Sequence, residues 1–187
     1  MESTRDKLLS AATDLLDHAG LEGVTLRAVG AAAGVSHNAP YKHFPDKEAL
    51  LAAVAANELR ALDASMRRIA SMSADPLERL RAVAREHIAW AIRHPRRFRL
   101  VFGSWSRHDD DLHLAASAAR LTLLDAVATA QQSEAIRQAE PEQVAALLMA
   151  TAHGAVDMYL SGHLVADGKG ESTPEALLED LVELLRR

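Results

Sequence analysis

The stretch from Thr25 to Leu50 constrains the fold of this chain more than any other part of it. Its sequence, TLRAVGAAAGVSHNAPYKHFPDKEAL, divides into two short amphipathic segments joined by a glycine. Thr25 is placed to cap the first segment, because its hydroxyl can accept a hydrogen bond from a free backbone N–H at a helix start. Gly34 is placed to end it, since glycine enters the left-handed conformation without a Cβ clash. The pattern predicts two short helices around a tight turn, a helix-turn-helix.

The second short segment has an unusual polar face, made of His37, Asn38, Lys42 and His43. We expect Ser36 to cap its helix. Pro40 has no N–H to donate the first intrahelical bond of a helix capped by Ser36. The alternative is therefore a helix that begins only at Asn38. Asp46 then caps a third, long helix over about residues 47 to 70.

The whole stretch resembles the DNA-binding signature of the tetracycline-repressor (TetR) family of bacterial regulators. The residues that carry the likeness are Thr25–Ala33, Gly34, Val35, Ser36, Tyr41, His43, Phe44, Lys47, Glu48 and Leu50. Pro40 departs from the leucine that is commoner in the family. The resemblance implies a homodimeric transcription regulator that binds double-stranded operator DNA.

Within this stretch the side-chain chemistry divides into two kinds of predicted DNA contact. Tyr41, His43 and Lys47 suit phosphates, which position a protein on DNA without reading its sequence. The alternative for Tyr41 is a core aromatic, but Phe44 is better placed for the core. Base reading falls to His37, Asn38 and Lys42, and Ala39 can touch a thymine methyl group. Thr25 and Arg27 complete the predicted interface, with Arg27 aimed at a phosphate or a guanine edge.

Composition narrows the class of protein. The net charge of −5 argues against a general polyanion binder, so nucleic-acid binding must rest on a local basic surface. Only four lysines are present, and Lys42 and Lys47 both fall in the helix-turn-helix. No apolar run approaches the roughly 18 residues of a membrane span, and the N-terminus lacks a signal peptide, so we expect a cytoplasmic protein that does not associate with membranes. There is no cysteine.

Helical periodicity continues through the rest of the chain and predicts an all-α fold of about nine helices. A first helix is expected over residues 3 to 19, ended by Gly20, and later ones over 76–94, 95–103, 110–131, from 141 to 160 or 162, and after 173. Arg96, Arg97 and Arg99 are expected on a solvated face. We predict a helix-turn-helix domain at residues 1–47 and an effector-binding and dimerisation domain at 48–187. The run from His108 to His113 has no diagnostic metal spacing, so neither a metal nor a cofactor is predicted.

A second resemblance covers the C-terminal half, which is similar to the WHG-type effector domain of part of the TetR family. His94-Pro95 with Phe98, Arg99 and Phe102, Ala152-His153-Gly154, and Ser161-Gly162-His163-Leu164 carry it, with Ala152 where the pattern has tryptophan. The resemblance and the local cluster of aromatics predict a ligand pocket lined by His87, Trp90, Phe98, Phe102, Trp105, Met149, His153 and Asp157. Packing in the core is an equally good explanation for His87 and His153. For Asp157 the alternative to the pocket is a position on the subunit interface.

The leading hypothesis is a ligand-responsive regulator, a repressor that a largely apolar or aromatic small molecule releases from its operator. One alternative is a dimeric DNA-binding regulator without an effector. The other is an all-α enzyme that uses His87, His153 and Asp157, which lacks a nucleophile and leaves the 25–50 signature unexplained. We therefore expect no enzymatic activity and no catalytic residues.

Overall fold

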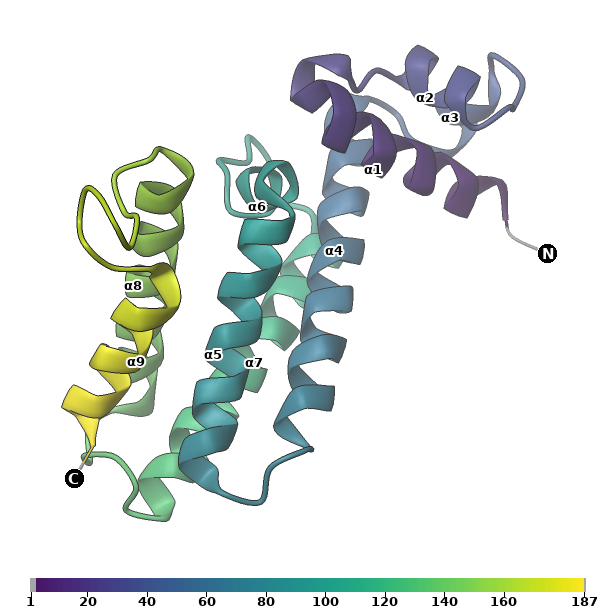
Figure 1. The fold of residues 1–187 in the computed structure, drawn as a ribbon. Helices are drawn as coiled ribbons and strands as arrows, with labels where there is room; N and C mark the ends of the chain where they lie inside the picture. Colours follow the sequence, from purple (N-terminus) through teal and green to yellow (C-terminus); the bar gives the residue numbers. More distant parts are fainter. Residues whose placement is uncertain (1–2, 187) are drawn as a thin grey trace. The chain divides into compact units, whose positions relative to one another are not determined.

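The computed structural model describes residues 3–186, so the outermost residues of the two predicted domains lie outside the described part. Within it the chain forms nine α-helices and two isolated β-bridges but no sheet, which confirms the all-α prediction (Figure 1). The helices are α1 (Thr4–Gly23), α2 (Leu26–Ala32), α3 (Ala39–His43), α4 (Lys47–Ala70), α5 (Pro76–Arg93), α6 (Pro95–Val101), α7 (Asp110–Gln132), α8 (Pro141–Leu160) and α9 (Pro174–Leu185). None of these described helices is both long and apolar enough to cross a membrane.

Side-chain caps explain where several helices begin. The Thr25 hydroxyl accepts a hydrogen bond from the Ala28 amide at 3.1 Å, and the Asp46 carboxylate accepts one from the Ala49 amide at 2.8 Å. At the start of α9 the Thr173 hydroxyl accepts from the Ala176 amide at 3.1 Å. Each of these bonds satisfies an amide that has no partner within its own helix.

Three predicted helix boundaries were wrong, and one of them is the end of α6, which lies at Val101 and not at residue 103. Gly20 does leave the helical conformation, with φ of 71°, but one further turn carries α1 on to Gly23. Ser36 does not cap α3, because that helix starts at Ala39 with Asn38 as its N-cap residue and no side-chain capping bond. The alternative start near Asn38 is therefore the correct one, and Pro40 lies in the first turn, where its missing N–H costs nothing.

The chain packs into two compact units. Of the described residues, the first unit contains 3–60 and 94–117, and the second contains 61–93 and 118–186, so each unit includes part of α4 and part of α7. These units are defined by which residues pack together, whereas the predicted domains were defined by function. The predicted domain boundary after residue 47 therefore remains a prediction.

In the first unit α1 packs against α2, α3 and α6 around a core that includes Leu8, Leu16, Val29 and Leu50. Arg97 does not face solvent as expected. Its guanidinium pairs with the Asp17 carboxylate of α1 and, at 3.2 Å, with the Glu58 carboxylate of α4. Neighbouring Arg96 and Arg99 are exposed as expected. The ion pairs therefore attach α6 to both α1 and α4.

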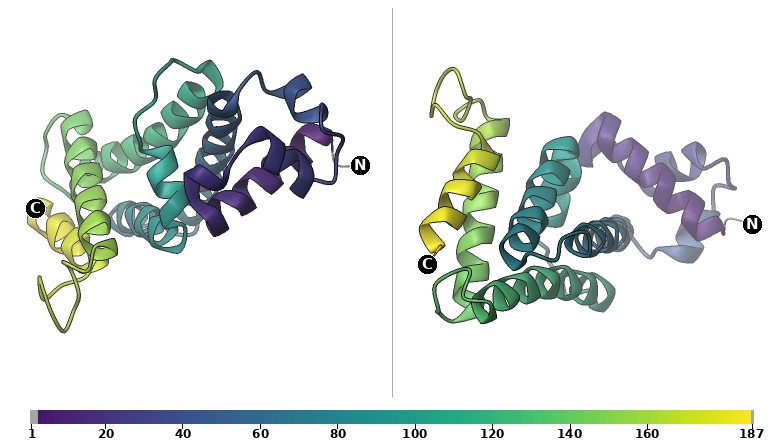
Figure 2. Two further views of the ribbon diagram at one scale, coloured as in Figure 1. Left: turned by 90° about the horizontal axis from the view of Figure 1, so that it is seen from above. Right: turned by 60° about the horizontal axis from the view of Figure 1, so that its bottom comes forward.

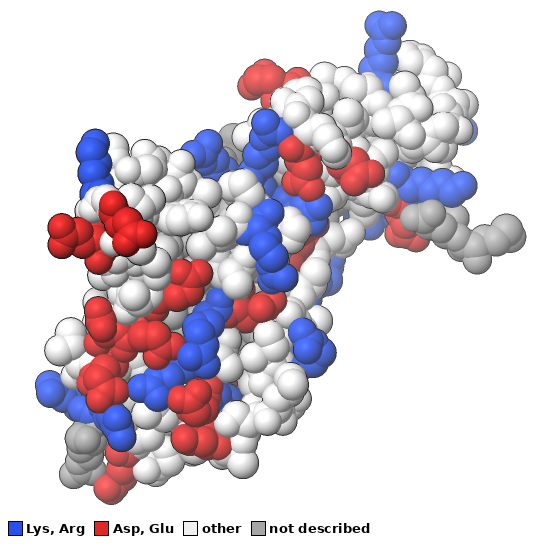
Figure 3. Space-filling model, viewed as in Figure 1, with Lys and Arg blue, Asp and Glu red and all other residues white. Residues whose placement is uncertain are grey.

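In the second unit α5 packs on α8 and α9, and α8 and α9 lie side by side in both views of Figure 2. The core includes Leu80, Ile88, Leu148 and Leu178. Over α5 and α9 the charged side chains of both signs are interleaved (Figure 3). Arg81 lies 3.0 Å from carboxylate oxygens of both Glu179 and Glu183, and Arg85 lies 2.8 Å from Glu179. These pairs attach α9 to α5.

Candidate nucleic-acid interface and ligand site

The turn between α2 and α3 depends on two glycines. Gly34 has φ of 64°, a conformation that disfavours residues with a Cβ, and this confirms its predicted role. The Val35 amide donates to the Gly30 carbonyl at 3.1 Å, which closes the turn. A Cβ at Gly30 would lie only 2.8 Å from Cγ of Pro40. Helix α3 therefore approaches α2 so closely that only glycine fits at position 30.

Most of the predicted DNA-contacting side chains share an exposed surface on and around α3, which we call the reading surface. Phe44 is 3% exposed and fills the core, as predicted, whereas Tyr41 is 52% exposed. Ala39 is half-buried, and the remaining members of the reading surface are exposed: Thr25, Arg27, His37, Asn38, Lys42 and His43. The rings of His37 and Tyr41 meet edge-to-face, with centroids 6.1 Å apart. Helix α3 and the two residues before it thus expose amide, imidazole, phenol and ammonium groups.

The ion pairs within the described part of the chain do not include the cations of the reading surface. Among residues 3–186, Arg27 and Lys42 form no ion pair, and the imidazoles of His37 and His43 form none with a carboxylate. Charges held in water without a partner are available to an anion such as a phosphate.

Lys47 has a different setting. It is half-buried, and its Nζ donates a 2.6 Å hydrogen bond to the Leu21 carbonyl near the end of α1. The ammonium therefore satisfies a helix-terminal carbonyl. The contact between Lys47 and a DNA phosphate remains a prediction. Such a contact would require the Lys47 ammonium to share or break its hydrogen bond to the Leu21 carbonyl.

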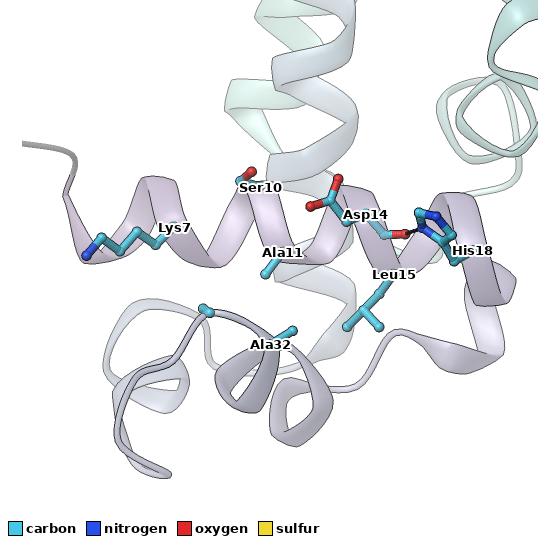
Figure 4. Close-up of a pocket in the computed structure, with 8 residues that line it drawn as sticks. Lys7, Ser10, Ala11, Asp14, Leu15, His18 and Ala32 are labelled. Carbon is cyan, nitrogen blue, oxygen red and sulfur yellow. Dashed lines mark hydrogen bonds between the residues drawn. The ribbon is translucent and has the colours of Figure 1, made fainter.

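Sequence reasoning missed the contribution of the first helix. The guanidinium carbon of Arg5 lies 5.6 Å from the centre of the Phe44 ring, which places a cation beside the end of α3. Lys7 lies at one end of a groove of about 430 Å³ between α1 and the end of α2, with His18 at the other end and Ala32 across it (Figure 4). Both cations are visible in the sequence, but only tertiary packing brings them beside the helix-turn-helix.

The eight residues of the predicted ligand pocket divide between the two units. Five belong to the second unit, where His87 of α5 and His153 of α8 stack with ring centroids 5.3 Å apart and planes 16° apart. Trp90 is buried nearby on α5, Met149 is half-buried and Asp157 is exposed. Ala152, where the WHG pattern has tryptophan, is buried. The two histidines thus meet at the contact between α5 and α8, while Asp157 faces outward.

Burial changes the protonation of the histidine pair. It lowers the pKa of His87 from 6.5 to about 3, and the neighbouring His153 adds to the effect. Burial also lowers the pKa of His153. Both rings are neutral at pH 7, so they bring no charge to the contact between α5 and α8.

The other three predicted pocket residues belong to the first unit. The rings of Phe98 and Phe102 pack with centroids 5.3 Å apart, and Phe102 is 38% exposed. Trp105 is half-buried and lines a cleft with residues of α1, α4 and α6. Nowhere between residues 3 and 186 do three histidine, aspartate or glutamate side chains gather closely enough to share a metal ion.

Two protein-family models match this chain. Residues 8–54 match the model described as bacterial regulatory proteins of the tetR family, and residues 80–185 match the tetracyclin repressor-like C-terminal domain. Together these matches cover the helix-turn-helix and the bundle that includes α5, α8 and α9.

Solved structures show the same fold. A protein of unknown function from Rhodococcus sp. RHA1 is 27% identical, covers 100% of this chain and 97% of its own, and has a TM-score of 0.86. A TetR family transcription regulator from Marinobacter aquaeolei VT8 is 20% identical over 98% of this chain and 95% of its own, with a TM-score of 0.73. AibR in complex with isovaleryl coenzyme A and operator DNA is 21% identical over 98% of both chains, with a TM-score of 0.69.

A curated relative matches over a shorter stretch. The nucleoid occlusion factor SlmA of Vibrio vulnificus (strain YJ016) is 32% identical over 100 residues, which is 53% of this chain. The matched stretch spans about half the length of that relative, 51%.

Proposed function

Because this chain belongs to the TetR family of bacterial transcription regulators, we propose that it is a homodimeric repressor that a small molecule releases from its operator. The family assignment points to a DNA-binding regulator and away from the enzyme alternative. The observation that carries the proposal is the reading surface, where Arg27, Tyr41 and Lys42 are exposed on a helix-turn-helix and the two cations form no ion pair with described residues.

The protein makes two kinds of contact with DNA, to phosphates and to base edges. Tyr41, His43 and Lys47 contact phosphates and fix the position of α3 in the major groove. His37, Asn38 and Lys42 read base edges, Ala39 meets a thymine methyl group, and Arg27 reaches a phosphate or a guanine. Thr25 holds the start of α2 through its bond to the Ala28 amide, and its exposed position leaves the hydroxyl beside the groove. A helix of five residues, Ala39–His43, reads few base pairs, so one copy supplies little specificity.

A second copy doubles the site that is read. Two reading surfaces bind successive major grooves when they lie about 34–36 Å apart. The surface that suits dimerisation lies on α8 and α9, which expose Leu147 (47%), Met158 (44%) and Leu184 (70%). Leucines exposed to this degree on neighbouring helices of one unit favour a four-helix interface between subunits. We call this the α8–α9 face, and the exposed Asp157 of α8 directly precedes Met158 in the chain.

The effector is a largely apolar or aromatic molecule with one or two hydrogen-bonding groups. The neutral, stacked rings of His87 and His153 beside Trp90 supply apolar area with few polar atoms, as ligand sites do. Met149 is half-buried on the same helix as His153. Phe98, Phe102 and Trp105 supply aromatic surface in the other unit. That AibR, a protein of the same fold, is described with both isovaleryl coenzyme A and operator DNA supports a regulator of this shape that binds both.

A regulator without an effector is the second candidate. The likeness to SlmA supports it, because that relative is named as a nucleoid occlusion factor and not as a ligand-responsive regulator. Both candidates act on chromosomal DNA in the cytoplasm, and both need the reading surface.

Fluorescence anisotropy with the DNA that flanks the protein's own gene tests the proposal. We expect the full chain to bind this DNA at least about a thousandfold more tightly than a random duplex of equal length. His37→Ala should reduce this preference, because it removes a base-reading group, and Arg120→Gln, at an exposed arginine on α7, should leave it unchanged. Equal binding of flanking and random DNA by the unaltered protein would contradict the proposal. Adding apolar and aromatic metabolites to the complex separates the two candidates, since only a ligand-responsive repressor is released.

A further inference from the structure

A cleft in the first unit lies where the helix-turn-helix region meets α6. It has a volume of about 440 Å³, which falls in the range of small-molecule sites. Its walls come from the end of α1, the first turns of α4, the end of α6 and the loop after α6: Leu21, Lys47, Glu48, Leu51, Arg99, Leu100, Gly103, Ser104, Trp105 and Ser106. All of these residues belong to one compact unit, whereas His87 and His153 belong to the other.

The cleft has an apolar floor and charged edges. Leu51 and Leu100 are buried, Leu21 is 40% exposed and the half-buried Trp105 supplies an aromatic wall. Leucine side chains beside an indole ring favour the apolar part of a ligand, and an aromatic ring packs on indole with additional gain.

The charges at the edges favour an anion. Lys47 and Arg99 both line the cleft, and neither forms an ion pair with any described residue. Glu48 is the opposing charge, but the Ser106 hydroxyl, 2.7 Å from both of its oxygens, donates a shared hydrogen bond to them, and one oxygen accepts a 3.1 Å bond from the Ser106 amide. Two cations and one engaged carboxylate leave one net positive charge, which a monoanion neutralises.

The loop that carries Trp105 is attached to the start of α4 by polar contacts. Besides the Ser106–Glu48 bonds, the Arg107 guanidinium lies 2.6 Å from the carboxylate of Asp46, the residue that caps α4. The loop of Trp105 is therefore attached to the first turn of α4, which carries Lys47. A site held in place before the ligand arrives loses less entropy on binding.

We propose that this cleft binds a small aromatic carboxylate, with its ring against Trp105 and its carboxylate on Lys47 and Arg99. The carboxylate is a stronger partner for the Lys47 ammonium than the neutral Leu21 carbonyl, because both groups of the new pair are charged. A bound carboxylate thus engages a side chain that is predicted to contact operator phosphate. The second step, competition with DNA, rests on the DNA-binding function proposed above, whereas ligand binding does not.

Calorimetric titration of the full chain with sodium 1-naphthoate tests the binding step, with the neutral 1-naphthamide as the matched ligand. We expect 1-naphthoate to bind at least about tenfold more tightly than 1-naphthamide, since a charge-assisted bond to arginine separates them. Arg99→Gln should reduce that difference, because only Lys47 then pairs with the carboxylate, and Arg120→Gln should keep it, because Arg120 does not line the cleft. Trp105→Leu should weaken both ligands alike.

Three results would overturn the binding step: no heat of binding up to about 1 mM 1-naphthoate, equal affinity for the two ligands, or an unchanged affinity in Arg99→Gln. The competition step is measured by anisotropy with the gene-flanking DNA. Saturating 1-naphthoate should weaken DNA binding several-fold, and 1-naphthamide should not. If the ligand-free protein fails to bind this DNA, the proposed function fails and the ligand site stands. If DNA binds but 1-naphthoate has no effect, the competition step alone fails.

Discussion

The reading surface and the α5–α8–α9 bundle use charged and apolar side chains in opposite ways. On the reading surface the exposed cations Arg27 and Lys42 form no ion pair with described residues, and the aromatic Phe44 is buried. In the bundle, Arg81 and Arg85 pair with carboxylates of α5 and α9, while Leu184 is 70% exposed. The reading surface therefore exposes charged groups to a partner, whereas the bundle exposes apolar groups.

This contrast indicates two different partners. Unpaired cations in water attract a polyanion at little cost, and this attraction weakens as salt rises. Exposed leucines on neighbouring helices gain from being covered by another apolar surface, which depends little on salt. The contrast therefore supports DNA at α3 and a second subunit at the α8–α9 face.

The largest expected effect comes from breaking the α8–α9 face. Leu147→Glu combined with Leu184→Glu places four like charges in a symmetric interface, so we expect monomers by light scattering. A monomer holds a single reading surface, and its affinity for the gene-flanking DNA should fall about a thousandfold, towards that of non-specific binding. Leu114→Glu is the control, because Leu114 of α7 is 67% exposed but lies outside this face. A double variant that stays dimeric would place the interface elsewhere.

Acid should act on the bundle through the buried histidine pair. Burial, with His153 as a second cause, lowers the pKa of His87 to about 3 in the folded chain, against 6.5 for an exposed histidine. Between these values the unfolded chain binds more protons, so the free energy of unfolding falls as the pH falls. The stability due to neutral His87 is complete above pH 6.5 and is lost at about 1.4 kcal/mol per pH unit below it. His87→Leu should flatten this slope in denaturant titrations, and an equally steep slope in that variant would exclude His87 as its cause.

The sequence predicts the fold better than it predicts the sites. Caps and helix-ending glycines act within a few residues, so Thr25, Gly34, Asp46 and Thr173 marked boundaries that the structure confirms. Helix boundaries were predicted wrongly where two sequence signals disagreed. Ser36 is a good capping residue, but Pro40 limits the backbone, and α3 begins at Ala39 instead.

Partners distant in the sequence were not predictable. Arg97 reads as a surface residue from helical periodicity, and only the packing of α6 on α1 and α4 reveals its ion pairs with Asp17 and Glu58. Lys47 likewise bonds to the Leu21 carbonyl, which lies 26 residues earlier. Such pairings depend on tertiary structure, which local patterns do not specify.

The same substitution at two helical glycines sharpens the comparison of the two regions. Gly30→Ala should destabilise the chain by about 1–3 kcal/mol and weaken DNA binding, because its Cβ would lie 2.8 Å from the Pro40 ring and would displace α3. A Cβ at Gly154 of α8 would meet open space, so Gly154→Ala should gain up to about 1 kcal/mol from helix propensity. Thermal unfolding measures both. A loss of stability in Gly154→Ala would mean that a second subunit covers this part of α8.

The smallest effect separates two lysines of the helix-turn-helix region. Lys47→Ala should weaken binding to all DNA by about fivefold at physiological salt and lower the salt slope by about one unit, since one phosphate contact is lost. It should also lower the melting temperature of the free protein slightly, because the Leu21 carbonyl loses its 2.6 Å bond. Lys42→Ala should leave that melting temperature unchanged, because the exposed Lys42 forms no ion pair with a described residue, and should instead alter the preference among operator variants. Titrations of specific and random duplexes at several salt concentrations distinguish these roles. If both variants lose affinity equally for every duplex, Lys42 contacts the DNA backbone and is not a base-reading residue.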